Sequence, residues 1–476
     1  MKRIIAITLL LSVAACSAAD HDESESLGES SELLLNGAPN GAFLTLRGVI
    51  NKATENLRRA DTNAYYDAIF IDPEGDGGWD PNGAPVKTIT SGLPTLKDFQ
   101  NVYFSGWSET KASYYNRGDL GLGREMHCVD RSRSDGQIAC YVTNYVAAPL
   151  QADGKFSELS FGLSPNIAFD NLIAKKPVAT VAMVFRGRAV AGRDKVFFVV
   201  YDAAGKKTDS APLDRHGLAY FNEFAGNPNP DSARFGTPGV TFNNHIPSNC
   251  LSCHGGKYQS ANSPRVSDAF FLPFDLDQFE YKDAAGFRRA ELQDEFRSLN
   301  QIARNVATKV GGASHSIVLQ IDGWHGNTNH GTTLSRNFDD AGLGNNYVPN
   351  GWLADPNADA AQRARDTAVY KTVVRRSCRG CHMSLKHNEP NNAKPNLRFE
   401  TATEFRNLSP LSAAFIAQHK MPHALQTQRD FWQSGQRDAL ETYWRNTPNL
   451  SGAADVLHAA GPDRVVTLDP HIIAAY

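Results

Sequence analysis

A pattern of two cysteines and a histidine occurs twice in the chain and constrains it more than any other feature. The pattern is Cys-x-x-Cys-His, first at 250–254 and again at 378–382. With 7 cysteines and 14 histidines among 476 residues, chance alone would produce it only about 0.003 times per chain. The repetition therefore indicates two sites with the same chemistry.

The spacing within each copy suits the covalent attachment of haem c. Two thiols add to the two porphyrin vinyl groups, and the tight turn between them leaves the next histidine facing the iron. A thioredoxin-like redox pair or half of a zinc site would explain neither the repeated histidine nor the absence of a further Cys-x-x-Cys pair. The expected attachment and ligand residues are Cys250, Cys253 and His254 at the first site and Cys378, Cys381 and His382 at the second.

The amino terminus has the pattern of an export signal. Two basic residues at 2–3 precede an apolar stretch at 4–15, which is too short to span a bilayer. Small residues followed by Cys16 resemble a bacterial lipobox, which implies cleavage before Cys16 and lipidation of its thiol. Ser17 then suggests the outer membrane of a Gram-negative host, facing the periplasm or the cell surface. We therefore expect an exported protein that is anchored to the membrane by lipid.

The surroundings of both patterns resemble the cytochrome c superfamily, and those of the second do so over most of a domain. A segment with helical apolar spacing, 368–374, leads into Cys378. Met421-Pro422 follows at the distance of a class I distal-ligand loop, and Thr427 is a candidate N-cap for a C-terminal helix.

For the second haem, the resemblance implies axial ligation by His382 and Met421. Thioether ligation of this kind raises the reduction potential. Met383 directly follows the proximal histidine and cannot reach the other face of the haem. The competing distal ligands are His387, His419 and His423.

The first haem has no obvious distal ligand. Neither methionine nor histidine lies between His254 and an expected amphipathic helix at 287–309, whereas phenylalanines crowd 270–279 and would surround a porphyrin. Met126 and Met183 lie far upstream in the sequence. The iron is then either bis-histidine ligated or open on one side, and the candidate histidines are His127, His315, His325 and His330.

The chain before the haem patterns is β-rich. The runs 178–185 and 195–201 predict a hairpin. Cys128 and Cys140 flank a polar loop, and in an oxidising compartment they predict a disulfide that closes a hairpin. Acidic residues at 72–80 resemble a calcium loop, but Gly83 occupies its twelfth position, so an ordinary acidic turn is favoured over calcium.

The expected fold class is α+β, with a β-rich domain before two mainly α-helical haem units. The expected divisions are a signal peptide at 1–15, a disordered tether at 16–33, the β-rich domain at 34–240, a first haem unit at 241–330, a second at 331–450 and a C-terminal tail at 451–476.

Composition and motifs together favour an electron-transfer protein that works with redox partner proteins. The net charge of −3 gives no basic surface for nucleic acid. A Met-ligated C-terminal haem after an unusual N-terminal one resembles the layout of dihaem cytochrome c peroxidases, although their characteristic stretch before the first site is absent at 237–244. A redox enzyme with a small-molecule substrate and a haem-based sensor are the alternatives.

Overall fold

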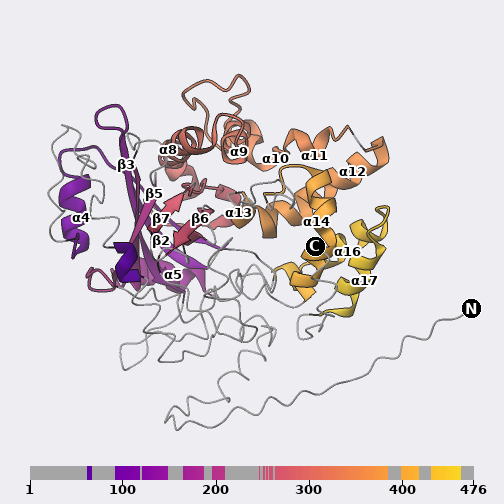
Figure 1. The fold of residues 1–476 in the computed structure, drawn as a ribbon, viewed down its shortest axis with the longest axis horizontal. Coiled ribbons are helices and arrows are strands. Elements are labelled where there is room, and N and C mark those ends of the chain that lie inside the picture. The colour runs from indigo at the N-terminus through magenta and orange to yellow at the C-terminus, as the bar shows by residue number, and fades with distance from the viewer. Residues whose placement is uncertain are drawn as a thin grey trace, which may run out of the picture.

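A six-stranded antiparallel sheet forms one half of the protein, and helices form most of the other half (Figure 1). The strand order is β5-β4-β3-β2-β1-β8. The computed structural model describes residues 62–66, 92–117, 121–147, 164–186, 196–208, 246, 250–251, 254–255, 257–260, 263–267, 269–356, 358–383, 398–417 and 430–461. The strands of the sheet are β1 (Thr110–Asn116), β2 (Leu122–Arg131), β3 (Gln137–Val146), β4 (Ala179–Arg186), β5 (Val196–Asp202) and β8 (Phe279–Glu280).

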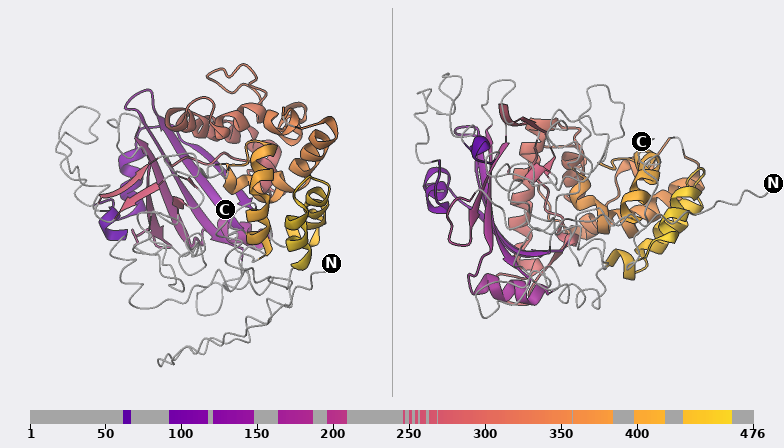
Figure 2. Two further views of the ribbon diagram at one scale, coloured as in Figure 1. Left: turned by 45° about the vertical axis from the view of Figure 1, so that its right-hand side comes forward. Right: turned by 60° about the horizontal axis from the view of Figure 1, so that its bottom comes forward.

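The sheet is covered on both faces, and β4 and β5 are its most apolar strands, whereas β1 and β2 carry several polar or charged residues. β4 and β5 are rich in valine and phenylalanine, pair antiparallel and confirm the predicted hairpin. The helices α4 (Leu96–Tyr103) and α5 (Pro165–Ile173) lie on the outer face, and α8 (Gln293–Gly311) packs against the inner face (Figure 2). The ring of Phe296 in α8 meets that of Tyr114 in β1 at a centroid distance of 5.5 Å.

A disulfide joins the two central strands of the sheet. Cys128 in β2 and Cys140 in β3 are directly opposite in the register, and their sulfur atoms are bonded. The predicted disulfide is therefore confirmed, at a sequence separation of 12 residues. The pair lies on the inner face of the sheet, beside the apolar space described below.

The remaining described elements extend the helical half. A two-stranded sheet is formed by β6 (Lys257–Ser260) and β7 (Ser263–Ser267). The other helices are α9 (Ser316–Trp324), α10 (Leu343–Asn346), α11 (Asn350–Leu353), α12 (Ala360–Val369), α13 (Arg379–His382), α14 (Ala402–Ala417), α16 (Gln436–Arg445) and α17 (Ser451–Ala459). Shorter turns are the 3-10 helices η4 (Leu276–Gln278), η5 (Arg289–Leu292) and η6 (Asp340–Gly342), and the π-helix η7 (Tyr370–Cys378).

The helices flanking the second cysteine pattern agree with the sequence predictions. The approach segment is helical as α12 followed by η7, and it buries Val373 and Val374. α16 packs against both of these helices, and the Tyr443 hydroxyl donates to Oδ1 of Asp366 at 2.7 Å. The expected C-terminal helix and its packing are confirmed from Gln436 onward, but Gly435, with a φ of +81°, interrupts the helix before α16. Thr427 lies outside the described residues.

The overall α+β layout is confirmed, but the cores do not follow the expected boundaries. β8 comes from the expected first haem unit and yet pairs with β1, and one hydrophobic cluster joins the sheet to Phe338 and, further along the chain, to Met383. The β-rich region and the following segment therefore fold around one core instead of two. A second core begins at Val348 and includes α17, so the segment after 450 is a packed helix at its start. Among the described residues, no helix is long and apolar enough to cross a membrane.

Replacing Cys128 and Cys140 together by serine should lower the free energy of unfolding by about 3 kcal/mol. A crosslink of this loop length restricts the unfolded chain by roughly that amount. Urea unfolding of the wild type and the double variant measures the difference. Adding a reductant should lower the wild-type midpoint and leave the variant unchanged; equal midpoints without reductant would contradict the expectation.

Candidate functional site

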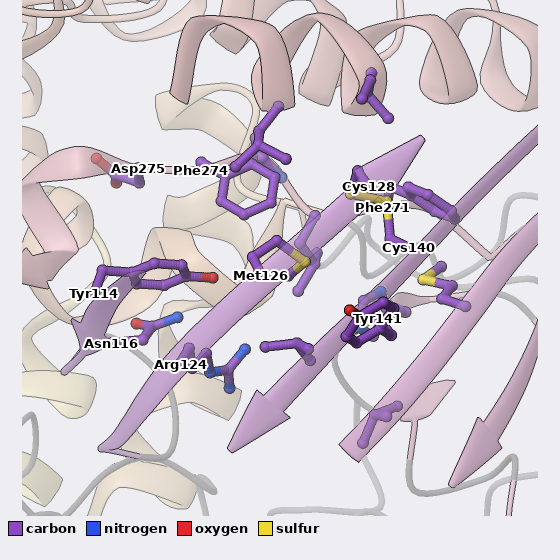
Figure 3. Close-up of a pocket in the computed structure, with 18 of the residues that line it drawn as sticks. Tyr114, Asn116, Arg124, Met126, Cys128, Cys140, Tyr141, Phe271, Phe274 and Asp275 are labelled. Carbon is purple, nitrogen blue, oxygen red and sulfur yellow. A yellow bond between two sulfur atoms is a disulfide. The ribbon is translucent and has the colours of Figure 1, made fainter. Parts of the chain in front are cut away.

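A cavity lies between the inner face of the sheet and the chain that crosses above it (Figure 3). Its enclosed space amounts to about 110 Å³, and it continues into space that is open to solvent. Strands β1 to β5 form one wall, and the phenylalanine-rich segment 271–279 with α8 forms the other. The phenylalanine cluster noted in the sequence therefore borders this cavity.

His254 lines the cavity with its ring held in one orientation. The main-chain N–H of Phe270 donates to the His254 carbonyl at 2.9 Å, and Nδ1 of His254 lies 2.7 Å from the Phe270 carbonyl oxygen. Because a carbonyl oxygen only accepts, Nδ1 carries the proton and Nε2 keeps its lone pair. Burial and, to a smaller extent, the charge of Arg124 lower the pKa of His254 to about 4, although the hydrogen bond to Phe270 opposes this shift. The imidazole is thus neutral, as a metal ligand must be.

The described residues of the first pattern and the glycine that follows it form a turn. Cys250 and Leu251 are helical, and Gly255 ends the turn with a φ of +66° while its N–H donates to the Leu251 carbonyl at 2.9 Å. A residue with a Cβ atom would be strained at that φ, so glycine is favoured at this position. Cys253 lies outside the described residues.

The second pattern lies at the junction of η7 and α13. Cys378 forms no disulfide, and burial raises the pKa of its thiol to about 12. The His382 ring stacks on Phe399 with centroids 4.2 Å apart. Cys381 belongs to α13, and its side-chain position is not described. Outside the described residues lie Met421, His387, His419 and His423.

Arg379, between the two cysteines of the second pattern, ties that pattern to the cavity of the first. Its Nε donates to Asp275 at 2.9 Å, and both side chains are only 3% exposed. Asp275 is itself a lining residue of the cavity, as is Gly380. The guanidinium also lies over the Trp324 ring at 5.0 Å. The two patterns therefore meet at one wall.

His127 does not reach the cavity. Successive side chains of a strand point to opposite faces, so His127 lies on the outer face while Met126 and Cys128 line the cavity. Its Nε2 is 3.1 Å from Oε1 of Glu125, its Nδ1 contacts Glu109, and its ring stacks on Tyr141. The prediction of His127 as a ligand of the first iron thus has no support from its position.

The three downstream histidines also lie away from the cavity lining. His325 uses both ring nitrogens, with Nδ1 donating to the Arg336 carbonyl at 2.7 Å and Nε2 accepting from Asn300 at 3.2 Å. His330 pairs with Asp322 at 2.7 Å. His315 caps α9 by accepting from the Ile317 N–H. Among the described residues, His254 is the one histidine that lines the cavity.

The sheet brings two methionines to the cavity that the sequence analysis set aside as too far upstream. Met126 in β2 and Met183 in β4 both line it, as does Arg124, one of the arginines of that strand. Strand alternation was the available signal, since residues 124, 126 and 128 share one face. Strand alternation does not tell which face of β2 lies toward His254, because that depends on tertiary packing.

No protein-family model, curated protein or solved structure matches the chain. Within the described residues, no group of three or more histidine, cysteine, aspartate or glutamate side chains is placed to hold a metal ion. The acidic segment 72–83 and the lipobox cysteine Cys16 lie outside the described residues.

The buried His325 should make stability depend on pH. Burial lowers its pKa to about 4 despite the hydrogen bond to Arg336, and the side chain is 1% exposed. Between pH 6.5 and 4, this histidine is protonated in the unfolded chain but not in the folded one. The free energy of unfolding therefore falls as the pH is lowered through that range, by up to about 3 kcal/mol.

The variant His325→Asn should remove this contribution, because its amide can still donate to the Arg336 carbonyl but does not titrate. Urea unfolding of both proteins from pH 7 to pH 4 gives the comparison, with His458→Asn at an exposed position as the control. An identical pH dependence in wild type and His325→Asn would contradict the assignment.

Proposed function

We propose that the chain is a c-type cytochrome with two covalently attached haems that transfers electrons. In this proposal Cys250, Cys253 and His254 hold one haem, and Cys378, Cys381, His382 and Met421 hold the other. Lipid on Cys16 would anchor the protein at the outer membrane, where it exchanges electrons with partner proteins.

The state of His254 is the observation that best supports the first haem site. Histidines that ligate metals commonly donate their second ring N–H to a carbonyl or carboxylate, which fixes the tautomer and the ring plane. The hydrogen bond from Nδ1 of His254 to Phe270 is of this kind, and it leaves Nε2 as the donor atom for a metal. The ring meets Phe198 edge-on at 5.4 Å, which further restricts its rotation.

The chemical character of the cavity lining also supports a porphyrin. Aromatic and aliphatic side chains from both walls, such as Phe271 and Val181, suit the macrocycle, and Arg124 supplies a cation for its carboxylates. A covalently bound haem supplies a one-electron couple whose potential depends on its axial ligands. The Phe270 carbonyl and the Phe198 ring hold the imidazole in place.

The closeness of the second pattern to the cavity supports electron transfer between two sites in one chain. Gly380 lies within the second attachment pattern and also lines the first cavity. Met383, which directly follows His382, belongs to the same hydrophobic cluster as the sheet, and its carbonyl accepts from Ser316 at 2.9 Å. These contacts fix the second pattern against the first site.

Counting the haems tests the proposal. Protein from cells that mature c-type cytochromes should contain two haems per chain by the pyridine haemochrome assay. Cys250→Ser and Cys378→Ser should each lose or weaken one attachment, and His458→Asn, which changes an exposed residue outside the patterns, should keep both. A wild type without covalent haem, or a Cys250→Ser variant with two full attachments, would contradict the proposal.

A further inference from the structure

We propose that Met126 supplies the distal ligand of the first haem through its thioether sulfur, so that this iron is six-coordinate. The inference rests on the proposed function and goes beyond it, because it brings an axial ligand from the sheet to a haem attached more than a hundred residues later. It also decides whether the first site binds external ligands.

The position of Met126 on the sheet is the first observation that supports this ligand. Strand β2 presents Met126 on its inner face, and Figure 3 shows the side chain projecting from the strand into the space bordered by Phe274. Met126 is only half-buried although it lies on the covered face of the sheet. Its free surface therefore faces the cavity in which the haem would lie.

Met126 also lies on the side of the cavity that a distal ligand requires. The His254 ring contacts Phe198 of β5, and β7, which follows the attachment pattern, contacts β5 as well. From β5 to β2 there are three strand spacings, or about 14 Å. A histidine entering at β5 and a methionine rising from β2 can approach a macrocycle from opposite faces.

Met183 is the competing thioether, and its position argues against it. It is paired with Phe198 in the register, so it lies beside the residue that contacts the proximal imidazole. It is also packed to 7% exposure, which leaves little of its side chain open to the cavity. Met183 is thus placed on the proximal side.

The chemistry of the lining favours a neutral, soft ligand. The described histidines other than His254 lie outside the cavity lining, and the two cysteines that face it are joined in the disulfide. A thioether needs no deprotonation and no hydrogen-bond partner, so it fits an apolar wall. It also stabilises ferrous iron and raises the reduction potential.

The matched variants Met126→Leu and Met183→Leu test the assignment, because each removes one sulfur and keeps a similar apolar volume. Both should keep two haems by pyridine haemochrome. After dithionite reduction, carbon monoxide should shift about half of the haem spectrum in Met126→Leu and none in the wild type or in Met183→Leu. The potential of one haem should also fall in Met126→Leu alone.

A further variant separates a ligand role from a packing role. Met126→His should restore a six-coordinate iron that does not bind carbon monoxide, at a lower potential than in the wild type. Met421→Ala, in parallel, should open the other haem, and the double variant Met126→Leu with Met421→Ala should bind carbon monoxide at both.

The outcomes distinguish the inference from the proposed function. Two haems in Met126→Leu with no carbon monoxide binding, or binding that appears in Met183→Leu instead, would overturn the Met126 assignment and leave the cytochrome proposal intact. Carbon monoxide binding by half of the wild-type haem that rises to all of the haem in Met421→Ala would show an open first iron and would also overturn it. A wild type without covalent haem would overturn both.

Discussion

The buried ion pair between Arg379 and Asp275 is the interaction on which the arrangement of the two cysteine patterns depends. Both side chains are almost fully enclosed, and the guanidinium also donates to the Tyr370 hydroxyl at 3.2 Å. Separating such a pair would leave a buried charge uncompensated, at a cost of about 3–5 kcal/mol. The pair therefore fixes the second pattern against the wall of the first cavity.

The sheet also brings several side chains to the cavity. On its outer face, α5 packs against β1 to β3 and Phe99 of α4 contacts Tyr141, while its inner face carries the disulfide, two thioethers and Arg124 toward the cavity. The crosslink between Cys128 and Cys140 holds β2 and β3 in register beside Met126. In the proposed function, this rigid face would fix one side of the first haem while the loop from 250 supplies the other.

Local patterns predicted local structure well. The hairpin of β4 and β5, the disulfide and the helices around Cys378 follow from strand alternation, cysteine placement and helical periodicity, and the structure confirms them. The structure around the first pattern was harder to predict from the sequence. The short strand β8, for example, belongs to the sheet only through its pairing with the distant strand β1. The sequence offered four candidate histidines for the first iron, His127 among them, whereas strand alternation places Met126 at the cavity.

The central claim is that iron lies in the cavity beside His254. Anomalous X-ray scattering at the iron edge, from crystals of the mature protein, tests it directly. The account predicts two iron positions in each chain, one bonded to Nε2 of His254 within the cavity and one beside His382. A chain without iron, or with iron away from His254, would contradict the account.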